Sequence, residues 1–107
     1  MQKHEINILE TYWSKLDEME ELLKLPSVKN NKVLHDNIKH TVFTLRQLYD
    51  EVESDYKTII DMRYFDDKEE CEWADVADEL YVSVFRVLRK RNKLMKITAE
   101  RLGFILI

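Results

Sequence analysis

The sequence predicts an all-α protein that forms one domain, 1–107, and three observations lead to this fold class. Glycine and proline occur once each, as Gly103 and Pro26, which leaves too few turn residues for a chain of strands. Charged residues make up 36% and hydrophobic residues 45% of the chain, a mixture typical of amphipathic helices. Apolar residues recur every three or four positions, as one face of a helix requires. A chain of 107 residues suits a single hydrophobic core.

Residues 1–53 predict two long helices packed as an antiparallel hairpin. One apolar stripe runs from Glu5 to Lys24 and includes Trp13, which we expect in the core, and a second stripe runs from Lys32 to Glu53. The segment LPSVKNN between them contains Pro26 and paired asparagines, which predict the turn. The same stripes are also compatible with an intermolecular coiled coil, so both a monomer and a homodimer remain open.

Residues 54–107 predict three further helices. Ser54 is expected to cap a helix that continues through Phe65 and ends at residues 66–68. A short helix follows from about Glu72 to Leu80, and the turn YVS leads to a final helix that Ser83 caps and that ends near Leu102. The aliphatic end GFILI is expected to fold back over the hairpin, with a role as an exposed docking strip as the alternative.

The last two predicted helices have the spacing of a helix-turn-helix. The small Ala77 suits the point where the helices approach, Val82 fills the turn, and Val87 points back into the core. Tyr81 stands where such turns favour glycine, so either the backbone there is left-handed and strained or the turn takes another shape. Burial of these positions places four basic residues on one outward stripe: Arg86, Arg89, Lys90 and Lys93.

The charge of the chain is distributed unevenly. The formal net charge is -4, but residues 1–80 carry ten basic and twenty acidic side chains, whereas residues 81–107 carry seven basic side chains and Glu100 alone. Such asymmetry within one small domain predicts a polyanionic partner for the basic face. The acidic run around residues 66–72 is expected to be a solvated connector that repels DNA and so orients the basic face.

The basic stripe predicts binding of double-stranded DNA, because a helix fits the major groove and its first turns reach base edges. Arg86 and Arg89 are expected to contact base edges or nearby phosphates. The expected contacts to the DNA backbone come from Lys90, Arg91, Lys93 and Lys96. The helix would begin at Ser83, with Val84 and Phe85 placed against thymine methyl groups or against a protein partner. Five phosphate contacts would give a log-log salt slope of roughly -4 to -5.

Several motifs of the second half stand together: MRYF at the end of a helix, Trp73 at the start of the short helix, VS in the turn, arginine at 86 and 89, and the closing TAERLG. With these motifs, residues 55–105 resemble the C-terminal half of the RinA and ArpU type of phage late-gene transcriptional regulators, and more distantly region four of bacterial sigma factors. The resemblance covers about half of the chain. It implies a sigma-region-four-like helix-turn-helix whose segment Ser83 to Lys93 enters the major groove, and contact with host RNA polymerase.

The sequence therefore predicts a DNA-binding transcriptional regulator of a phage or mobile genetic element. A first alternative is a small interaction protein that uses the same scaffold to bind and modulate a phage transcription regulator or an RNA polymerase subunit. A second alternative is a terminase-type small subunit, in which the hairpin would drive ring assembly. Mass in solution separates this last alternative from the others, because a ring is a large oligomer and a regulator is a monomer or dimer.

Other function classes have little support in the sequence. His35 and His40 lie five positions apart, off a common helical face, and the single Cys71 has acidic neighbours that disfavour a thiolate, so we expect no metal site and no catalytic cysteine. Nothing groups a nucleophile with a base and an oxyanion donor, so we expect no enzyme and no cofactor. The charged start MQKHEINILE and the lack of a long apolar run predict a cytoplasmic protein without a membrane segment.

Overall fold

The computed structural model describes residues 1–65 and 70–104, and all regular structure in these residues is helical. The all-α fold class predicted from the sequence is therefore confirmed. In chain order the elements are α1 (Lys3–Ser14), α2 (Leu16–Leu22), α3 (Pro26–Lys29), α4 (Lys32–Glu51), α5 (Ser54–Ile60), the π-helical turn η1 (Asp61–Phe65), α6 (Trp73–Leu80) and α7 (Val84–Leu102).

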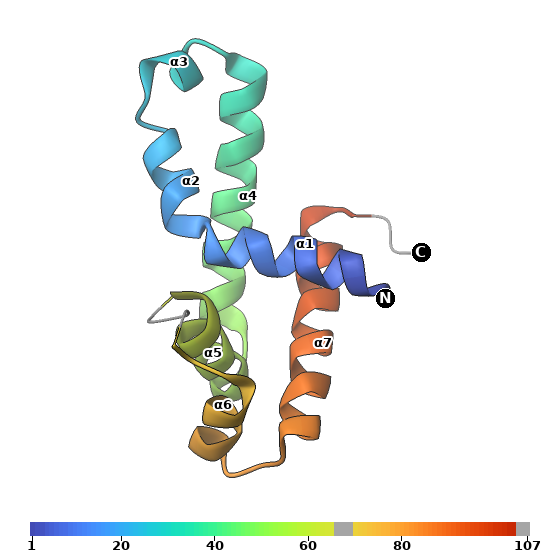
Figure 1. Cartoon of the computed structure of the whole chain (residues 1–107). Coiled ribbons are helices and arrows are strands. Elements are labelled where there is room, and N and C mark those ends of the chain that lie inside the picture. Colours follow the sequence, from blue (N-terminus) through green and yellow to red (C-terminus); the bar gives the residue numbers. More distant parts are fainter. Residues whose placement is uncertain (66–69, 105–107) are drawn as a thin grey trace.

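The single first helix predicted from Glu5 to Lys24 is wrong, because the chain bends at Lys15. The backbone there has φ -105° and ψ 13°, outside the helical region, and separates α1 from α2. Figure 1 shows the result: α1 crosses α4 and α7, whereas α2 runs beside α4. The bend lets one continuous apolar stripe be buried in two different directions. Trp13 donates a hydrogen bond to Thr98 of α7, while Leu16, three residues later, is buried at the start of α2.

An arm made of α2, α3 and α4 extends beyond the crossing helix α1 (Figure 1). Pro26 occupies the first turn of α3, where its missing N–H costs no hydrogen bond. Asn31 caps α4 by accepting a hydrogen bond from the backbone N–H of Leu34 at 3.2 Å. The predicted second helix is confirmed with its start at Lys32 and its end at Glu51, two residues before the expected end.

Within the arm, Arg46 joins α4 to α2 through two carboxylates. Its Nε donates to Oε1 of Glu20 at 2.7 Å, and its Nη2 donates to Oδ1 of Asp17 at 2.9 Å. Burial alone would lower the pKa of Arg46, but the hydrogen bonds and charges of Glu20 and Asp17 outweigh it and raise that pKa. The guanidinium also lies 5.6 Å from the ring centre of Phe65, so it bridges α2, α4 and η1.

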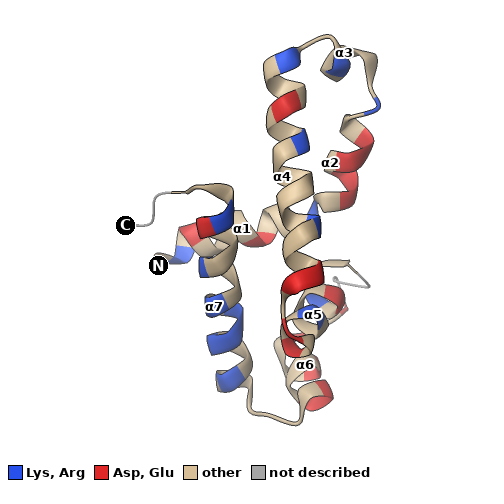
Figure 2. Cartoon of the chain, turned by 180° about the vertical axis from the view of Figure 1, so that it is seen from behind, with Lys and Arg blue, Asp and Glu red and all other residues tan. Residues whose placement is uncertain are grey.

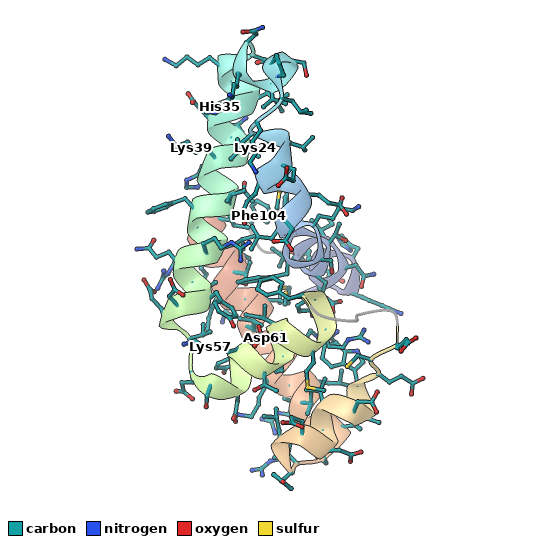
Figure 3. All side chains as sticks on the ribbon, turned by 90° about the vertical axis from the view of Figure 1, so that its left-hand side faces the viewer. Lys24, His35, Lys39, Lys57, Asp61 and Phe104 are labelled. Atoms are coloured by element: carbon teal, nitrogen blue, oxygen red, sulfur yellow. The ribbon has the colours of Figure 1, made fainter. Side chains whose placement is uncertain are left out.

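The third helix differs from its prediction in two ways. Ser54 is its first helical residue rather than its cap, because Glu53 holds the N-cap position without a side-chain hydrogen bond. The last turn, Asp61–Phe65, widens into a π-helix. Figure 3 labels Lys57 of α5 and Asp61 of η1, and both contact Tyr49 of α4. The Tyr49 hydroxyl donates to Oδ1 of Asp61 at 2.8 Å, and Nζ of Lys57 lies 5.9 Å from the centre of the Tyr49 ring. The predicted helix end at residues 66–68 lies outside the described residues.

The core draws buried side chains from both parts of the chain, 1–53 and 54–107. At the C-terminal end, Gly103 takes the left-handed conformation (φ 80°), and Phe104 turns its ring to within 5.7 Å of the Tyr12 ring on α1. The remaining residues of the GFILI segment, 105–107, lie outside the described part of the chain. The largest fully buried side chains are Trp13, Leu9, Leu16, Leu45, Leu48, Ile59, Ile60, Leu94, Met95, Val76, Val87 and Thr98.

Candidate nucleic-acid interface

Helices α6 and α7 have the boundaries that the sequence predicts. Glu72 caps α6 in a reciprocal capping box with Asp75, and the Ser83 hydroxyl caps α7 by accepting from the N–H of Arg86 at 3.2 Å. Ala77 and Val87 are both buried, as expected for the side chains where the two helices meet. These local signals fix the direction in which α7 leaves the turn.

The turn between these helices is left-handed at Tyr81, with φ 57° and ψ 40°. The N–H of Val82 donates to the carbonyl of Ala77 at 3.1 Å, and the N–H of Tyr81 donates to the carbonyl of Asp78 at 3.3 Å. This pair of bonds is the Schellman motif, which usually has glycine at the left-handed position. Tyr81 therefore holds a strained conformation with its side chain 95% exposed.

Replacing Tyr81 by glycine is expected to raise the free energy of unfolding by about 0.5–1 kcal/mol. The left-handed conformation costs a residue with a Cβ roughly 1–2 kcal/mol, and the added entropy of glycine in the unfolded chain removes part of that gain. Urea denaturation measures the change. Gly103→Ala is the converse control, because Gly103 takes the left-handed conformation at the end of α7, and its substitution is expected to lower the free energy of unfolding. A Tyr81→Gly variant less stable than the wild type would show that the tyrosine ring makes a stabilising contact.

The face of α7 opposite the core is basic. Val87, Leu94, Met95 and Ala99 are buried on one side. Figure 2 shows basic positions along α7 and acidic positions on α6 and at the end of α4. Within residues 1–65 and 70–104, no carboxylate forms an ion pair with Arg86, Arg89, Lys93 or Lys96, whereas Arg101 near the end of α7 pairs with Glu51. The exposed side chains on the outward face are Phe85, Arg86, Arg89, Lys93 and Lys96.

Lys90 lies at the edge of this basic face and turns toward α5. Its Nζ is 3.2 Å from Oδ2 of Asp55 and 5.8 Å from the centre of the Tyr56 ring. Asp55 also lines a shallow hollow together with Val82, Arg86, Arg89 and Lys93. The Asp55 carboxylate therefore lies in a concave surface that also holds several basic side chains. It neutralises Lys90, one of the cations predicted to contact the DNA backbone.

Arg91 is largely taken up by contacts inside the protein. Its guanidinium is 3.5 Å from Oε1 of Glu10, and the two side chains are only 17% and 18% exposed. The other oxygen of Glu10 accepts a 2.6 Å hydrogen bond from the Tyr64 hydroxyl. Burial and the neighbouring Glu10 raise the pKa of Tyr64, so this hydroxyl stays protonated and keeps its role as donor.

Trp73 completes this network at the start of α6. Arg91 lies 5.2 Å from the centre of its ring system and Arg63 lies 4.4 Å from it. The network joins α1, η1, α6 and α7 and so holds α7 against the rest of the protein. Trp73 stood out in the sequence, but Glu10, Tyr64 and Asp55 did not, because no local pattern indicates which distant cation each of them meets.

An apolar patch lies beside the basic face, at the turn and the first turn of α7. Tyr81 is 95% exposed, Phe85 is 68% exposed and Val84 is 39% exposed. Arg89 lies over the Phe85 ring at 5.8 Å from its centre. The surface around the start of α7 thus combines cationic and apolar groups.

Other kinds of site find no support in the described residues. No group of three or more His, Cys, Asp or Glu side chains in 1–65 and 70–104 is arranged to hold a metal ion. No helix of this part of the chain has the length and apolar character needed to cross a membrane. Comparison with protein-family models, curated proteins and solved structures gave no match.

The Asp55→Asn substitution is expected to raise affinity for duplex DNA about three- to tenfold at low salt, because it removes a carboxylate from the basic hollow and frees Lys90. The salt slope should become steeper by roughly 1, the value of one added phosphate contact. Fluorescence anisotropy with a labelled duplex measures both. Asp36→Asn, which makes the same charge change on the arm, is expected to leave affinity nearly unchanged. Equal effects of the two variants would show that net charge alone is responsible.

Proposed function

We propose that the protein binds double-stranded DNA with the exposed face of α7 and acts as a transcriptional regulator of a phage or mobile genetic element. One observation carries this proposal: Arg86, Arg89, Lys93 and Lys96 all lie exposed on one face of a helix that a capped turn holds at the edge of the molecule. A helix of this kind fits the major groove, and cations along its outward face neutralise phosphates on either side.

The contacts that these residues make inside the protein support different proposed roles for them. Arg86 and Arg89, within the first two turns of α7, are assigned to base edges, and Lys93 and Lys96 to phosphates. Ser83 has a structural role as the cap. Lys90 is a weakened contact because of Asp55, and Arg91 serves to position α7 through Glu10 and Trp73.

The regulatory part of the proposal rests on the resemblance of residues 55–105 to phage late-gene regulators and to sigma region four. Such a regulator acts in the cytoplasm as a monomer or homodimer and contacts RNA polymerase or another regulator. The acidic α6, with Asp75, Asp78 and Glu79 exposed, suits this arrangement, because it repels phosphates and leaves α7 as the face toward DNA.

The test is retention of source-genome DNA fragments by the purified protein at low and moderate salt, followed by sequencing of the bound fraction. The wild type is expected to enrich one site, and Arg86→Ala/Arg89→Ala is expected to lose that enrichment. Lys32→Ala/Lys39→Ala removes the same charge from the arm, where Figure 3 labels Lys39, and should keep it. Absence of retention at low salt would overturn the proposal.

The second candidate is a protein-interaction module that binds a transcription regulator or a polymerase subunit. The exposed Tyr81, Val84 and Phe85 favour it, since exposed aromatic residues are typical anchors of protein interfaces. Phe85→Ser separates the candidates: it should leave phosphate-driven DNA binding largely intact but disrupt an apolar protein interface. If Phe85→Ser abolishes a partner complex while Arg86→Ala and Arg89→Ala have no effect, DNA binding is excluded as the function. A large ring in solution would instead favour the terminase-type small subunit.

A further inference from the structure

Phe85 is a large apolar side chain held at the position of α7 that would enter the groove first. Phe85 is 68% exposed in the first turn of the helix, two residues after the Ser83 cap. The cap and the buried Val87, two residues later, fix the backbone around Phe85, so its side chain leaves the helix from a defined backbone position. Its exposure is not needed for the fold, because the core is already complete on the opposite face of α7.

Arg89 lies directly beside Phe85 on the same face. The two residues are one helical turn apart, and the Arg89 guanidinium carbon is 5.8 Å from the centre of the Phe85 ring. A cation and an apolar ring therefore form one composite surface. Because Arg86, Lys93 and Lys96 surround this surface with positive charge, its charge complements a polyanion better than a neutral or basic protein face.

In the major groove, the only apolar group on a base edge is the C5-methyl of thymine, and the strongest arginine partner is the O6/N7 edge of guanine. We propose that Phe85 recognises a thymine methyl group and that Arg89 recognises a guanine close to it. The spacing of 5.8 Å corresponds to roughly one to two base-pair steps of about 3.4 Å. This inference rests on the proposed DNA-binding function and adds the base composition of the site.

The experiment compares two forms of the duplex that the wild type retains most strongly, one with thymine and one with uracil at every thymine position. Uracil pairs identically and lacks only the methyl group. The wild type is expected to bind the uracil form about fourfold more weakly for each methyl that Phe85 covers, the value of burying one methyl-sized group. Phe85→Ala is expected to bind both forms equally while its salt slope stays unchanged.

Phe43→Ala is the matched control, because Phe43 is 66% exposed on α4 of the arm, and this variant should keep the preference for thymine. Equal binding of both forms by the wild type would overturn the inference, and so would an undiminished thymine preference in Phe85→Ala. Both results leave DNA binding itself intact. Failure of the wild type to retain any duplex would instead overturn the proposed function, and the inference with it.

Discussion

Trp13→Ala is expected to lower the free energy of unfolding by about 3–5 kcal/mol, the largest stability effect of a single substitution in this protein. Trp13 is 0% exposed. Its Nε1 donates to Oγ1 of Thr98 at 3.1 Å, and its ring centre lies 6.2 Å from that of Phe65. Truncation removes a large apolar side chain, leaves a cavity between α1 and α7, and leaves Thr98 with one partner fewer.

Urea denaturation followed by far-UV circular dichroism measures this change. Proteins of this size have a total stability of about 5–15 kcal/mol, so the variant should lose a large fraction of its stability and unfold at a clearly lower urea concentration. Ile8→Ala on the same helix is the control, because Ile8 is 49% exposed and should cost less than about 1 kcal/mol. Similar costs for the two substitutions would contradict the packing of α1 across α7.

Reversing the charge of Arg86 and Arg89 is expected to reduce affinity for DNA at least 100-fold. Each arginine loses a base or phosphate contact worth roughly 1–3 kcal/mol, and each new carboxylate repels the phosphates. The variant is Arg86→Glu/Arg89→Glu, and fluorescence anisotropy with duplex DNA measures its affinity. Because both side chains are exposed, the melting temperature should stay near that of the wild type.

The matched variant Lys32→Glu/Lys39→Glu makes the same change of net charge on the arm. It is expected to weaken binding less than about threefold, because the arm extends away from α7 beyond the crossing helix α1 (Figure 1) and salt screens charges separated by more than about 10 Å. Comparable losses in both variants would show that DNA responds to total charge and not to α7.

The parts of the fold that the sequence predicted correctly depend on local signals. Ser83 marks the start of α7 because its hydroxyl satisfies a backbone N–H three residues on, and Gly103 marks its end because it accepts a left-handed backbone. Ala77 and Val87 were expected where the two helices meet because of their helical spacing, and both are buried. Each of these inferences needed only neighbouring residues.

The parts that the sequence did not predict depend on contacts between distant segments. The stripe from Ile6 to Leu23 keeps its helical period across Lys15, so nothing local indicates the bend that Trp13 and Leu16 require. The same reason applies to the candidate site. Helical spacing placed Lys90 with the outward cations, but only the fold shows that Asp55 lies beside it and that Glu10 reaches Arg91.

The salt dependence of binding to duplex DNA tests the central claim most directly. Arg86, Arg89, Lys93 and Lys96, the exposed cations of α7 without an ion pair to a described carboxylate, predict a log-log slope of about -3 to -4 for the wild type. This slope is shallower than five contacts would give, because Arg91 is paired with Glu10 and Lys90 with Asp55. Affinity measured by anisotropy from about 50 to 200 mM salt gives this slope. A slope in this range that falls by roughly 2 in Arg86→Ala/Arg89→Ala supports DNA binding through α7. Absence of binding at about 50 mM salt, or a slope that this variant leaves unchanged, contradicts it.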